Sequence, residues 1–302
     1  MNRSLKYRVN KYRTLIPFVL IGVAYYAVFN YIPLIWGVII SLKDFKVGST
    51  LMDAKWVGLQ NYIDVIQNPE MKKLLINTLR ISVARLIFTF IPPIILTLVI
   101  FDLKNVLFKR ISQTIVYVPH FFSWVIIYGI VYAFFCGTGF VNASLGMLGL
   151  PSYDFLTSKD AFVPLLVGSQ VWKEAGWNTI LYFAALTGVN PELFEAATLD
   201  GAGPIAKIRA ICIPTMLPII TFSMIMALGN ILNNDFEQIL LYYNASVYEV
   251  ADIIDTWVYR VGLGRMQYSI GAAVSMMKGF ISMLLILGSN SLSKKLTGRG
   301  MF

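Results

Sequence analysis

Six stretches of the chain consist almost entirely of apolar residues and are long enough to span a bilayer as helices. A spanning helix needs about 20 mainly apolar residues. The windows that meet this requirement are 15–42, 74–101, 112–135, 161–188, 210–232 and 268–291. The polar segments between them show no repeat of 20–50 residues and no separate soluble domain. This pattern predicts an all-α integral membrane protein with six transmembrane helices.

Lysine and arginine residues are distributed unequally between alternate connecting segments. With the N-terminus inside, the inner segments hold 13 of them, and the longer outer loops hold 8. Cytoplasmic loops carry the excess of positive charge, so we expect both termini in the cytoplasm. The apolar run after the basic N-terminus is much longer than the roughly 7–15 residues of a signal-peptide core. We therefore interpret it as a retained first span.

The expected organisation has four parts. They are a basic cytoplasmic N-terminus (1–14), a first span with its outer loop (15–73), a core of five spans (74–292) and a cytoplasmic tail (293–302). In the last outer loop, apolar residues recur every three or four positions near 249–260, and acidic residues fall on the other face. This spacing predicts a short amphipathic helix lying on the outer surface.

Composition agrees with a membrane protein and excludes several functional classes. The chain is 57% hydrophobic and 14% charged, with a mean hydropathy of +0.67, whereas soluble domains are about half apolar and a quarter charged. The net charge of +9 comes from residues beside apolar spans, so a nucleic-acid partner is not predicted. The two cysteines lie far apart and form no CxxC motif, which supports neither a disulfide framework nor a metal site.

The polar passage 190–209, between the fourth and fifth windows, predicts a short helix that ends in a sharp elbow. Asn190 is a favourable N-cap, and Pro191 suits the first helical position. Gly201 can adopt the left-handed conformation that ends many helices, and Gly203 with the proline after it breaks the chain again. Geometry alone favours a cytoplasmic loop helix that packs on its own membrane domain, because short loop helices are common.

The residues of this passage carry a resemblance to a known family. The sequence EAATLDGAGPIAKIRAICIPTMLP resembles the EAA motif of binding-protein-dependent ABC-importer permeases. Positions on the family pattern are Glu195, Ala196, Ala197, Asp200, Gly201, Ala202, Ile213, Pro214 and Pro218. The segment NTL (77–79) opens the second span as in the core domain of the family. The segments YVPHFFSWVI, VWKEAGWNTILYFAAL and VYEVADIIDTWVYRVGL are similar to the carbohydrate (maltose-permease-like) class, within it the LplB-type oligosaccharide permeases. Ile208 stands at a position where many members of the family have an aromatic residue.

This resemblance, which covers nearly the whole chain, implies both a function and a set of partners. The expected ATPase-coupling residues are Glu195, Ala196, Ala197, Asp200, Gly201 and Ala202, on a coupling helix that docks in a separate cytoplasmic ATPase. The expected partners are a second, non-identical permease, two ATPase subunits, an extracytoplasmic sugar-binding protein and an oligosaccharide cargo. The chain has no G-x-x-x-x-G-K-[ST] motif. We therefore expect a bacterial plasma-membrane transport subunit without catalytic activity, with ATP-Mg bound by the partner.

Polar and charged side chains within the spans provide the candidate substrate path, because such groups are costly in lipid and usually face a cavity or a partner. They are Arg80, Arg85, Gln170, Lys173, Glu174, Trp177, Asn178 and Lys278. The excess of three positive charges favours an anionic cargo, so we expect a bias towards uronate-bearing oligosaccharides, with Lys173 and Arg85 nearest the path. In an alternative interpretation without an anionic cargo, the Arg80 side chain reaches outward and the other cations pair with acids elsewhere.

Two other functional classes find less support in the sequence. A secondary transporter needs ion-coupling acids near the midplane and often shows repeat symmetry, but Glu174 is the only acid within the six windows. A membrane enzyme needs paired carboxylates, a Ser/His set or a metal cluster. The single histidine, His120, follows Pro119 and is expected to satisfy backbone groups at a kink instead of binding metal.

Overall fold

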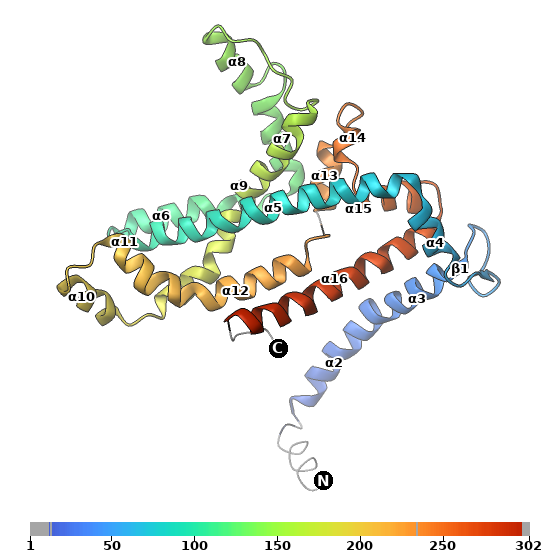
Figure 1. Ribbon diagram of the computed structural model, residues 1–302, viewed down its shortest axis with the longest axis horizontal. Coiled ribbons are helices and arrows are strands. Elements are labelled where there is room, and N and C mark those ends of the chain that lie inside the picture. Colours follow the sequence, from blue (N-terminus) through green and yellow to red (C-terminus); the bar gives the residue numbers. More distant parts are fainter. Residues whose placement is uncertain (1–11, 13, 234, 298–302) are drawn as a thin grey trace. The chain divides into compact units, whose positions relative to one another are not determined.

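The computed structural model describes residues 12, 14–233 and 235–297, and these are mostly helical (Figure 1). Most of the predicted basic N-terminus (1–14) and the end of the predicted tail (293–302) lie outside the described residues. The chain divides into two compact units. Unit 1 comprises Met1–Asn68 with Val258–Met277, and unit 2 comprises Pro69–Trp257 with Lys278–Phe302.

Unit 1 contains the first predicted span. Its elements are α2 (Ile16–Tyr26), η1 (Ala27–Tyr31), α3 (Ile32–Ser41), β1 (Lys43–Asp44), β2 (Lys55–Trp56), α4 (Gln60–Gln67), η4 (Val258–Gly264) and the first part of α16 (Tyr268–Thr297). The apolar window 15–42 forms one helical run that is widened by a π-helical turn at η1. A proline stands at the start of α2, where its missing N–H does least harm, and a second proline follows the π-helical turn at the start of α3.

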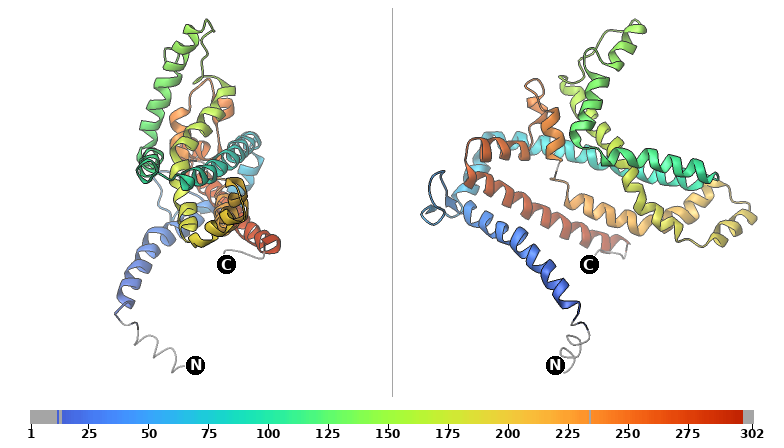
Figure 2. Two further views of the ribbon diagram at one scale, coloured as in Figure 1. Left: turned by 90° about the vertical axis from the view of Figure 1, so that its left-hand side faces the viewer. Right: turned by 180° about the vertical axis from the view of Figure 1, so that it is seen from behind.

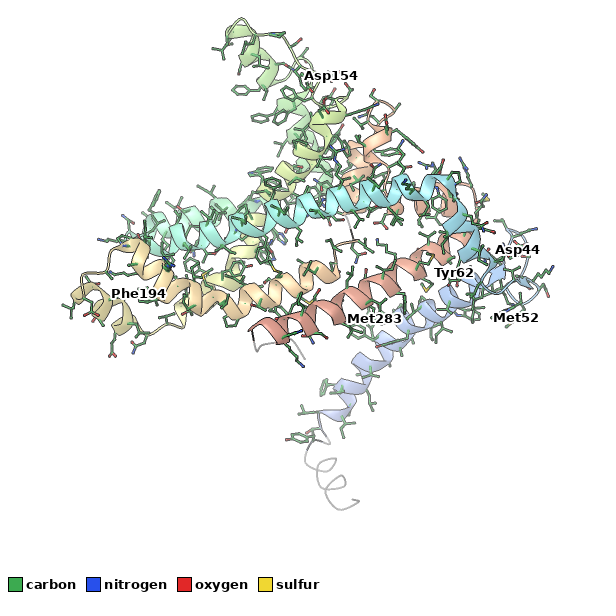
Figure 3. The ribbon with its side chains drawn as sticks, in the orientation of Figure 1. Asp44, Met52, Tyr62, Asp154, Phe194 and Met283 are labelled. Atoms are coloured by element: carbon green, nitrogen blue, oxygen red, sulfur yellow. The ribbon has the colours of Figure 1, made fainter. Side chains whose placement is uncertain are left out.

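Polar side chains hold the end of this first run against α4. The Asn61 amide donates to the backbone carbonyls of Ser41 and Lys43, at 2.8 and 3.0 Å. The hydroxyls of Ser41 and Tyr62 are 2.7 Å apart, and Tyr62 lies beside the two-stranded hairpin of β1 and β2 (Figure 3). The buried amide thus satisfies carbonyls that the end of a helix leaves without intrahelical partners.

Unit 2 contains the remaining predicted spans. Its elements are α5 (Pro69–Asp102), α6 (Val106–Tyr117), η2 (Val118–Phe121), α7 (Trp124–Phe135), α8 (Phe140–Met147), α9 (Lys159–Thr187), α10 (Pro191–Leu199), α11 (Pro204–Lys207), η3 (Ile208–Cys212), α12 (Ile213–Gly229), α13 (Phe236–Tyr242), α14 (Tyr248–Ala251), α15 (Ile254–Trp257) and the rest of α16. Figure 2 shows α9 running from the base of the α7–α8 arm to α10.

The apolar core of unit 2 forms where α5, α7, α9 and the α13–α15 segment meet. Ile81, Leu166, Ile239, Val247 and Ile253 are each fully buried in it. A second cluster lies towards the other end of the unit, where Tyr182, Leu186, Cys212 and Met216 join α9 to η3 and α12. Between the two clusters, the helices enclose polar side chains from several elements.

One predicted span is broken. The window 112–135 forms two helices, α6 and α7, separated by the 3₁₀ turn η2 and two further residues. Pro119 has no N–H to continue the helical ladder, and the Ser123 hydroxyl accepts from the N–H of Ile126 at 3.4 Å, which starts a new helix. The prediction of one continuous helix was therefore wrong at this window.

Within the described residues, five helical segments are long and apolar enough to cross a membrane. They are Ile16–Ser41, Pro69–Asp102, Trp124–Met147, Pro204–Gly229 and Tyr268–Lys295. The fourth predicted window, 161–188, lies in α9, a helix of 29 residues that is not among these five. The multi-pass architecture is thus confirmed.

The amphipathic helix predicted near 249–260 is divided and largely buried. The helices α14 and α15 are separated at Asp252, whose backbone is extended with ψ of 118°. Ile253 and Trp257 are buried inside unit 2 and do not lie on its surface. The prediction of a single surface helix was wrong because this segment is folded around side chains of α5.

The NTL motif of α5 explains that break. The Asn77 side chain donates to the carbonyls of Glu249 and Asp252, at 2.9 and 3.0 Å. The Thr78 hydroxyl accepts from the N–H of Ile254 at 3.1 Å. Both side chains thus provide partners for backbone groups that a continuous helix would satisfy internally. On the exposed side, a hydrogen bond from Lys159 lowers the pKa of the Glu249 carboxyl.

Candidate functional site

The predicted elbow starts as the sequence indicates. The Asn190 side chain accepts from the N–H of Glu192 at 3.1 Å, and Pro191 is the first residue of α10. This bond satisfies one of the four N–H groups that a helix leaves open at its start. The carboxylate of Glu192 lies in the first turn, where the helix dipole favours negative charge.

The end of α10 is a left-handed glycine turn. Gly201 has φ of +80°, as predicted. Its N–H donates to the carbonyl of Thr198 at 3.0 Å, and the N–H of Ala202 donates to that of Ala197 at 2.8 Å. Together these bonds form the Schellman arrangement, so both ends of the short helix are satisfied locally.

Most of the elbow is exposed, and one aromatic residue anchors it. Glu195, Ala196, Asp200 and Gly201 are exposed, and Leu199 is 89% exposed. Phe194 points the other way and packs with its ring centroid 5.8 Å from that of Phe101 on α5 (Figure 3). The elbow therefore presents an exposed surface, and Phe194 joins it to α5.

A polar cavity of about 250 Å³ lies among α5, α9, α12 and the segment after α12. Its walls provide hydroxyls and amides, and these belong to Ser82, Thr89, Tyr182 and Ser223 and to Gln170, Asn178, Asn230 and Asn233. Arg85 provides the charged group in this wall. Of the eight predicted path residues, the structure brings three together here, namely Arg85, Gln170 and Asn178.

Arg85 is only 6% exposed, and its guanidinium is incompletely paired. It donates to Oε1 of Gln238 at 2.5 Å. Its second partner, the carboxylate of Asp235, lies 3.9 Å away, beyond hydrogen-bond distance. Among the described residues its Nε finds no acceptor. A buried charge needs hydrogen bonds to offset its loss of hydration, so this arginine retains capacity for another anion.

Gln238 on α13 holds the arginine in place. Its amide nitrogen donates to the carbonyl of Leu166 at 2.8 Å and to the hydroxyl of Ser169 at 3.0 Å. Because both N–H bonds of that amide are used, its oxygen has to face Arg85. Gln238 is fully buried, and the Tyr242 hydroxyl also donates to Ser169 at 2.9 Å. This network fixes the direction of the guanidinium.

Lys173 and Glu174 form a different cluster, which does not line the cavity. The Lys173 ammonium donates to the carbonyls of His120 and Phe122, at 2.5 and 2.8 Å, in the break between α6 and α7. Glu174 lies 2.8 Å from Nδ1 of His120, whose ring stacks on Trp177 with centroids 4.2 Å apart. The histidine was expected to satisfy backbone groups, and instead its ring pairs with a carboxylate.

The remaining intramembrane cations change the charge balance assumed from the sequence. Lys278 lies 2.5 Å from the carboxylate of Asp255, and Arg80 is exposed. Asp235 and Asp255 belong to segments outside the predicted windows and reach cations inside them. The expected excess of three positive charges is thus partly compensated by acids of the same chain, and the incompletely paired Arg85 is the stronger indication of an anion site.

Sequence reasoning missed the partners of Arg85. Gln238 and Asp235 lie in a segment that the hydrophobic pattern assigns to an outer loop, about 150 residues further along the chain. No local spacing relates them to α5. A glutamine in the apolar pattern of 236–242 is the one signal that distinguishes this short helix.

Comparison with known proteins identifies the class of molecule that has this fold. Residues 93–297 match the family described as the binding-protein-dependent transport system inner membrane component. The chain belongs to this family. It is therefore a multi-pass permease subunit of an ABC importer in the bacterial plasma membrane.

Individual relatives extend over nearly the whole chain. Protein LplB of Bacillus subtilis (strain 168) is 38% identical over 292 residues, covering 96% of this chain and 90% of the relative. The polygalacturonan/rhamnogalacturonan transport system permease protein YteP of the same organism is 35% identical over 285 residues, covering 94% and 88%. An arabinooligosaccharide permease, AraP of that organism, is 28% identical over 276 residues, covering 90% and 85%.

Solved structures agree with the fold. A chain of a bacterial ABC transporter involved in the import of the acidic polysaccharide alginate superposes with a TM-score of 0.89 at 33% identity, covering 98% of this chain and 100% of the other. A chain of the bacterial alginate transporter in complex with an alginate pentasaccharide-bound periplasmic protein gives 0.88 at 32% identity, covering 97% and 98%.

Proposed function

We propose that this permease imports oligosaccharides that contain uronate residues. The observation that carries the proposal is the buried, incompletely paired Arg85 in the wall of a polar cavity. A guanidinium binds a carboxylate with two parallel N–H bonds, and the amides around it suit sugar hydroxyls. Relatives at 32–35% identity are named for alginate and polygalacturonan transport, and both of these polymers consist of uronates or contain them.

In this proposal the chain crosses the membrane six times, with both termini in the cytoplasm. The span that brings the number to six is α9, which contains the fourth predicted window. Its 29 residues extend about 44 Å at 1.5 Å per residue, which is more than the roughly 30 Å of the bilayer core. Its polar residues face the cavity and the His120 cluster, which supports a span that is shielded from lipid. The elbow then lies on the cytoplasmic side.

The same proposal assigns the energy source and the partners. The exposed elbow from Glu195 to Ala202 docks in one of two separate ATPase subunits, which bind ATP-Mg, and its glycine turn transmits their movement. A second, non-identical permease completes the path, and an extracytoplasmic binding protein delivers the sugar. Homodimers of this chain with full binding-protein-stimulated activity would contradict that assembly.

The cargo is tested on the assembled complex in proteoliposomes with its cognate binding protein. ATP hydrolysis is measured across a panel of oligosaccharides that contains each triuronate and its carboxyl-reduced, neutral form. We expect stronger stimulation by the acidic member of each pair. Equal stimulation by both members would contradict the acidic cargo. Uptake by the chain alone, without ATPase or binding protein, would contradict the importer mechanism itself.

A further inference from the structure

The carboxylate nearest to Arg85 belongs to the protein, and it is held loosely. Asp235 lies 3.9 Å from the guanidinium, and its other contact in the cavity wall is a hydrogen bond of 3.3 Å from the Gln170 amide. Its side chain is 46% exposed, whereas that of Arg85 is 7% exposed. The aspartate thus sits on the open side of a buried cation.

The backbone position of Asp235 provides it with another set of donors. Asp235 is the residue that precedes α13, but its side chain makes no capping bond to that helix. Aspartate is among the most favourable residues for accepting from first-turn N–H groups. A carboxylate that leaves Arg85 therefore finds N–H donors within its own turn.

The opposite side of the guanidinium is held firmly. Gln238 is fully buried, and both of its amide N–H bonds are engaged by Leu166 and Ser169. The neighbouring Gln170 has a buried oxygen that finds no donor among the described residues. Arg85 is thus fixed in direction by one neutral partner, while its charged partner and a nearby amide remain incompletely bonded.

We propose that Arg85 and Asp235 form a carboxylate-exchange site, in which a uronate carboxylate of the cargo replaces Asp235 on the guanidinium. This inference rests on the proposed acidic cargo and adds how the site selects and releases it. A neutral sugar brings no anion and leaves the Arg85–Asp235 pair in place. An acidic sugar takes over the guanidinium, and the unbonded oxygen of Gln170 accepts from a neighbouring sugar hydroxyl.

The exchange also keeps binding weak enough for transport. A cargo carboxylate has to compete with Asp235, and this competition lowers the affinity of the site for the cargo. Arg85 therefore has a carboxylate beside it both with and without bound cargo. When the cargo leaves, Asp235 returns and offsets the charge, which lowers the cost of release. Removing the competitor should strengthen binding of acidic cargo and slow its release.

The exchange is tested with Asp235→Asn in the assembled complex in nanodiscs without the binding protein. Weak binding of trigalacturonate and of its carboxyl-reduced form is measured by saturation-transfer NMR. Asparagine keeps the shape and the contact with Gln170 but removes the competing charge. We expect the variant to bind trigalacturonate at least about tenfold more tightly, because close charge pairs contribute strongly to binding, and to bind the neutral form unchanged.

Two matched variants complete the test. Asp235→Glu keeps the competing charge and should bind trigalacturonate as the wild type does. Gln238→Glu gives Arg85 a permanent buried counterion, at the expense of the amide N–H bonds to Leu166 and Ser169, and should lose the preference for the acidic sugar. In proteoliposomes, Asp235→Asn should lower both the KM and the maximal rate of triuronate uptake.

The failures of the two proposals are distinguishable. If the wild type prefers trigalacturonate but Asp235→Asn binds it with unchanged or weaker affinity, the exchange is overturned and the acidic cargo stands. If the wild type shows no preference within the pair, and Asp235→Asn shows none either, the acidic cargo is overturned together with the exchange.

Discussion

The elbow and the cavity satisfy their polar groups in opposite ways. In the elbow, the bonds that start and end α10 join residues between Asn190 and Ala202. In the cavity, Arg85 is bonded to a residue 153 positions away, and its Nε has no acceptor among the described residues. The elbow is exposed and its helix ends are closed by local bonds, whereas the cavity wall contains a buried arginine whose bonds are incomplete.

This difference indicates two kinds of function. A segment whose helix ends are closed by bonds between its own residues holds its shape locally and can present a surface to another protein. A buried group with open hydrogen-bonding capacity is costly, and it is retained where a ligand supplies the missing partner. The elbow is thus suited to transmit movement and the cavity to select cargo, so changes in one region should leave the property of the other intact.

The largest effect is expected from Gly201→Val in the elbow. Valine is β-branched and strongly disfavours the positive φ of +80° found at this position, so the Schellman bonds at the end of α10 are lost. Transport by the assembled complex should be abolished, while the protein remains inserted in the membrane. Uptake and ATP hydrolysis in proteoliposomes, together with membrane yield, measure the effect.

Gly201→Asn is the matched control for that variant. Asparagine accepts the left-handed conformation far better than valine, so it should retain a large part of the transport activity. Both variants should keep the wild-type preference between acidic and neutral sugars wherever uptake is measurable. Normal transport by Gly201→Val would remove the elbow from the coupling mechanism.

A smaller effect is expected from Gly176→Ala in the helix that forms part of the cavity wall. An added Cβ would lie 1.8 Å from the backbone oxygen of Val116 on α6, so the two helices would have to separate. Overpacking of this kind costs about 1–3 kcal/mol. The thermal unfolding midpoint of the purified complex should fall by several degrees, at roughly 2–4 °C per kcal/mol.

The same helix provides the control. Gly168 also lies on α9, and among the described residues no atom outside the backbone of its own helix lies within 4 Å of an added Cβ there. Gly168→Ala should leave the midpoint unchanged or raise it slightly, because alanine favours the helix. If both alanines lowered the midpoint equally, the close approach of α6 and α9 would not limit stability.

The smallest effect is expected from Asn190→Ala, which removes the N-cap of α10. Such a loss costs about 1 kcal/mol, so the elbow should fray and sugar uptake per ATP hydrolysed should fall a few-fold. Asn105→Ala removes a similar N-cap from α6, where Asn105 accepts from Phe108 N–H at 3.0 Å. An equal loss of coupling in both variants would show that the elbow has no special role.

Sequence reasoning succeeded where the relevant contacts are local. Asn190, Pro191 and Gly201 act through neighbours within a few positions, so their residue types indicate the start and the end of α10 directly. It failed at 249–260, because the apolar spacing there cannot reveal that the side chain of Asn77 holds the break at Asp252. The helical preference of this segment was overridden by its tertiary contact with Asn77.

The cavity was predicted only in part, for a related reason. Arg85, Gln170 and Asn178 were predicted because they are polar residues in apolar windows, and polar groups are costly in lipid unless they face a cavity or a partner. The same rule selected Lys173, whose ammonium is occupied by backbone carbonyls and for which we propose a structural role. Residue type alone does not distinguish a cation that faces a cavity from one that closes a helix break.

The most direct test of the account is the selectivity of Arg85→Gln, measured as the ratio of acidic to neutral uptake when a triuronate and its carboxyl-reduced form compete in the reconstituted complex. Hydrogen bonds to charged groups contribute about 1.5–3 kcal/mol, equivalent to roughly 10–100-fold. We predict that the ratio falls by at least about tenfold in Arg85→Gln and stays at the wild-type value in Lys173→Gln, in which total uptake decreases. An unchanged ratio in Arg85→Gln, with normal uptake of both sugars, would contradict the assignment of this cavity to the carboxylate of the cargo.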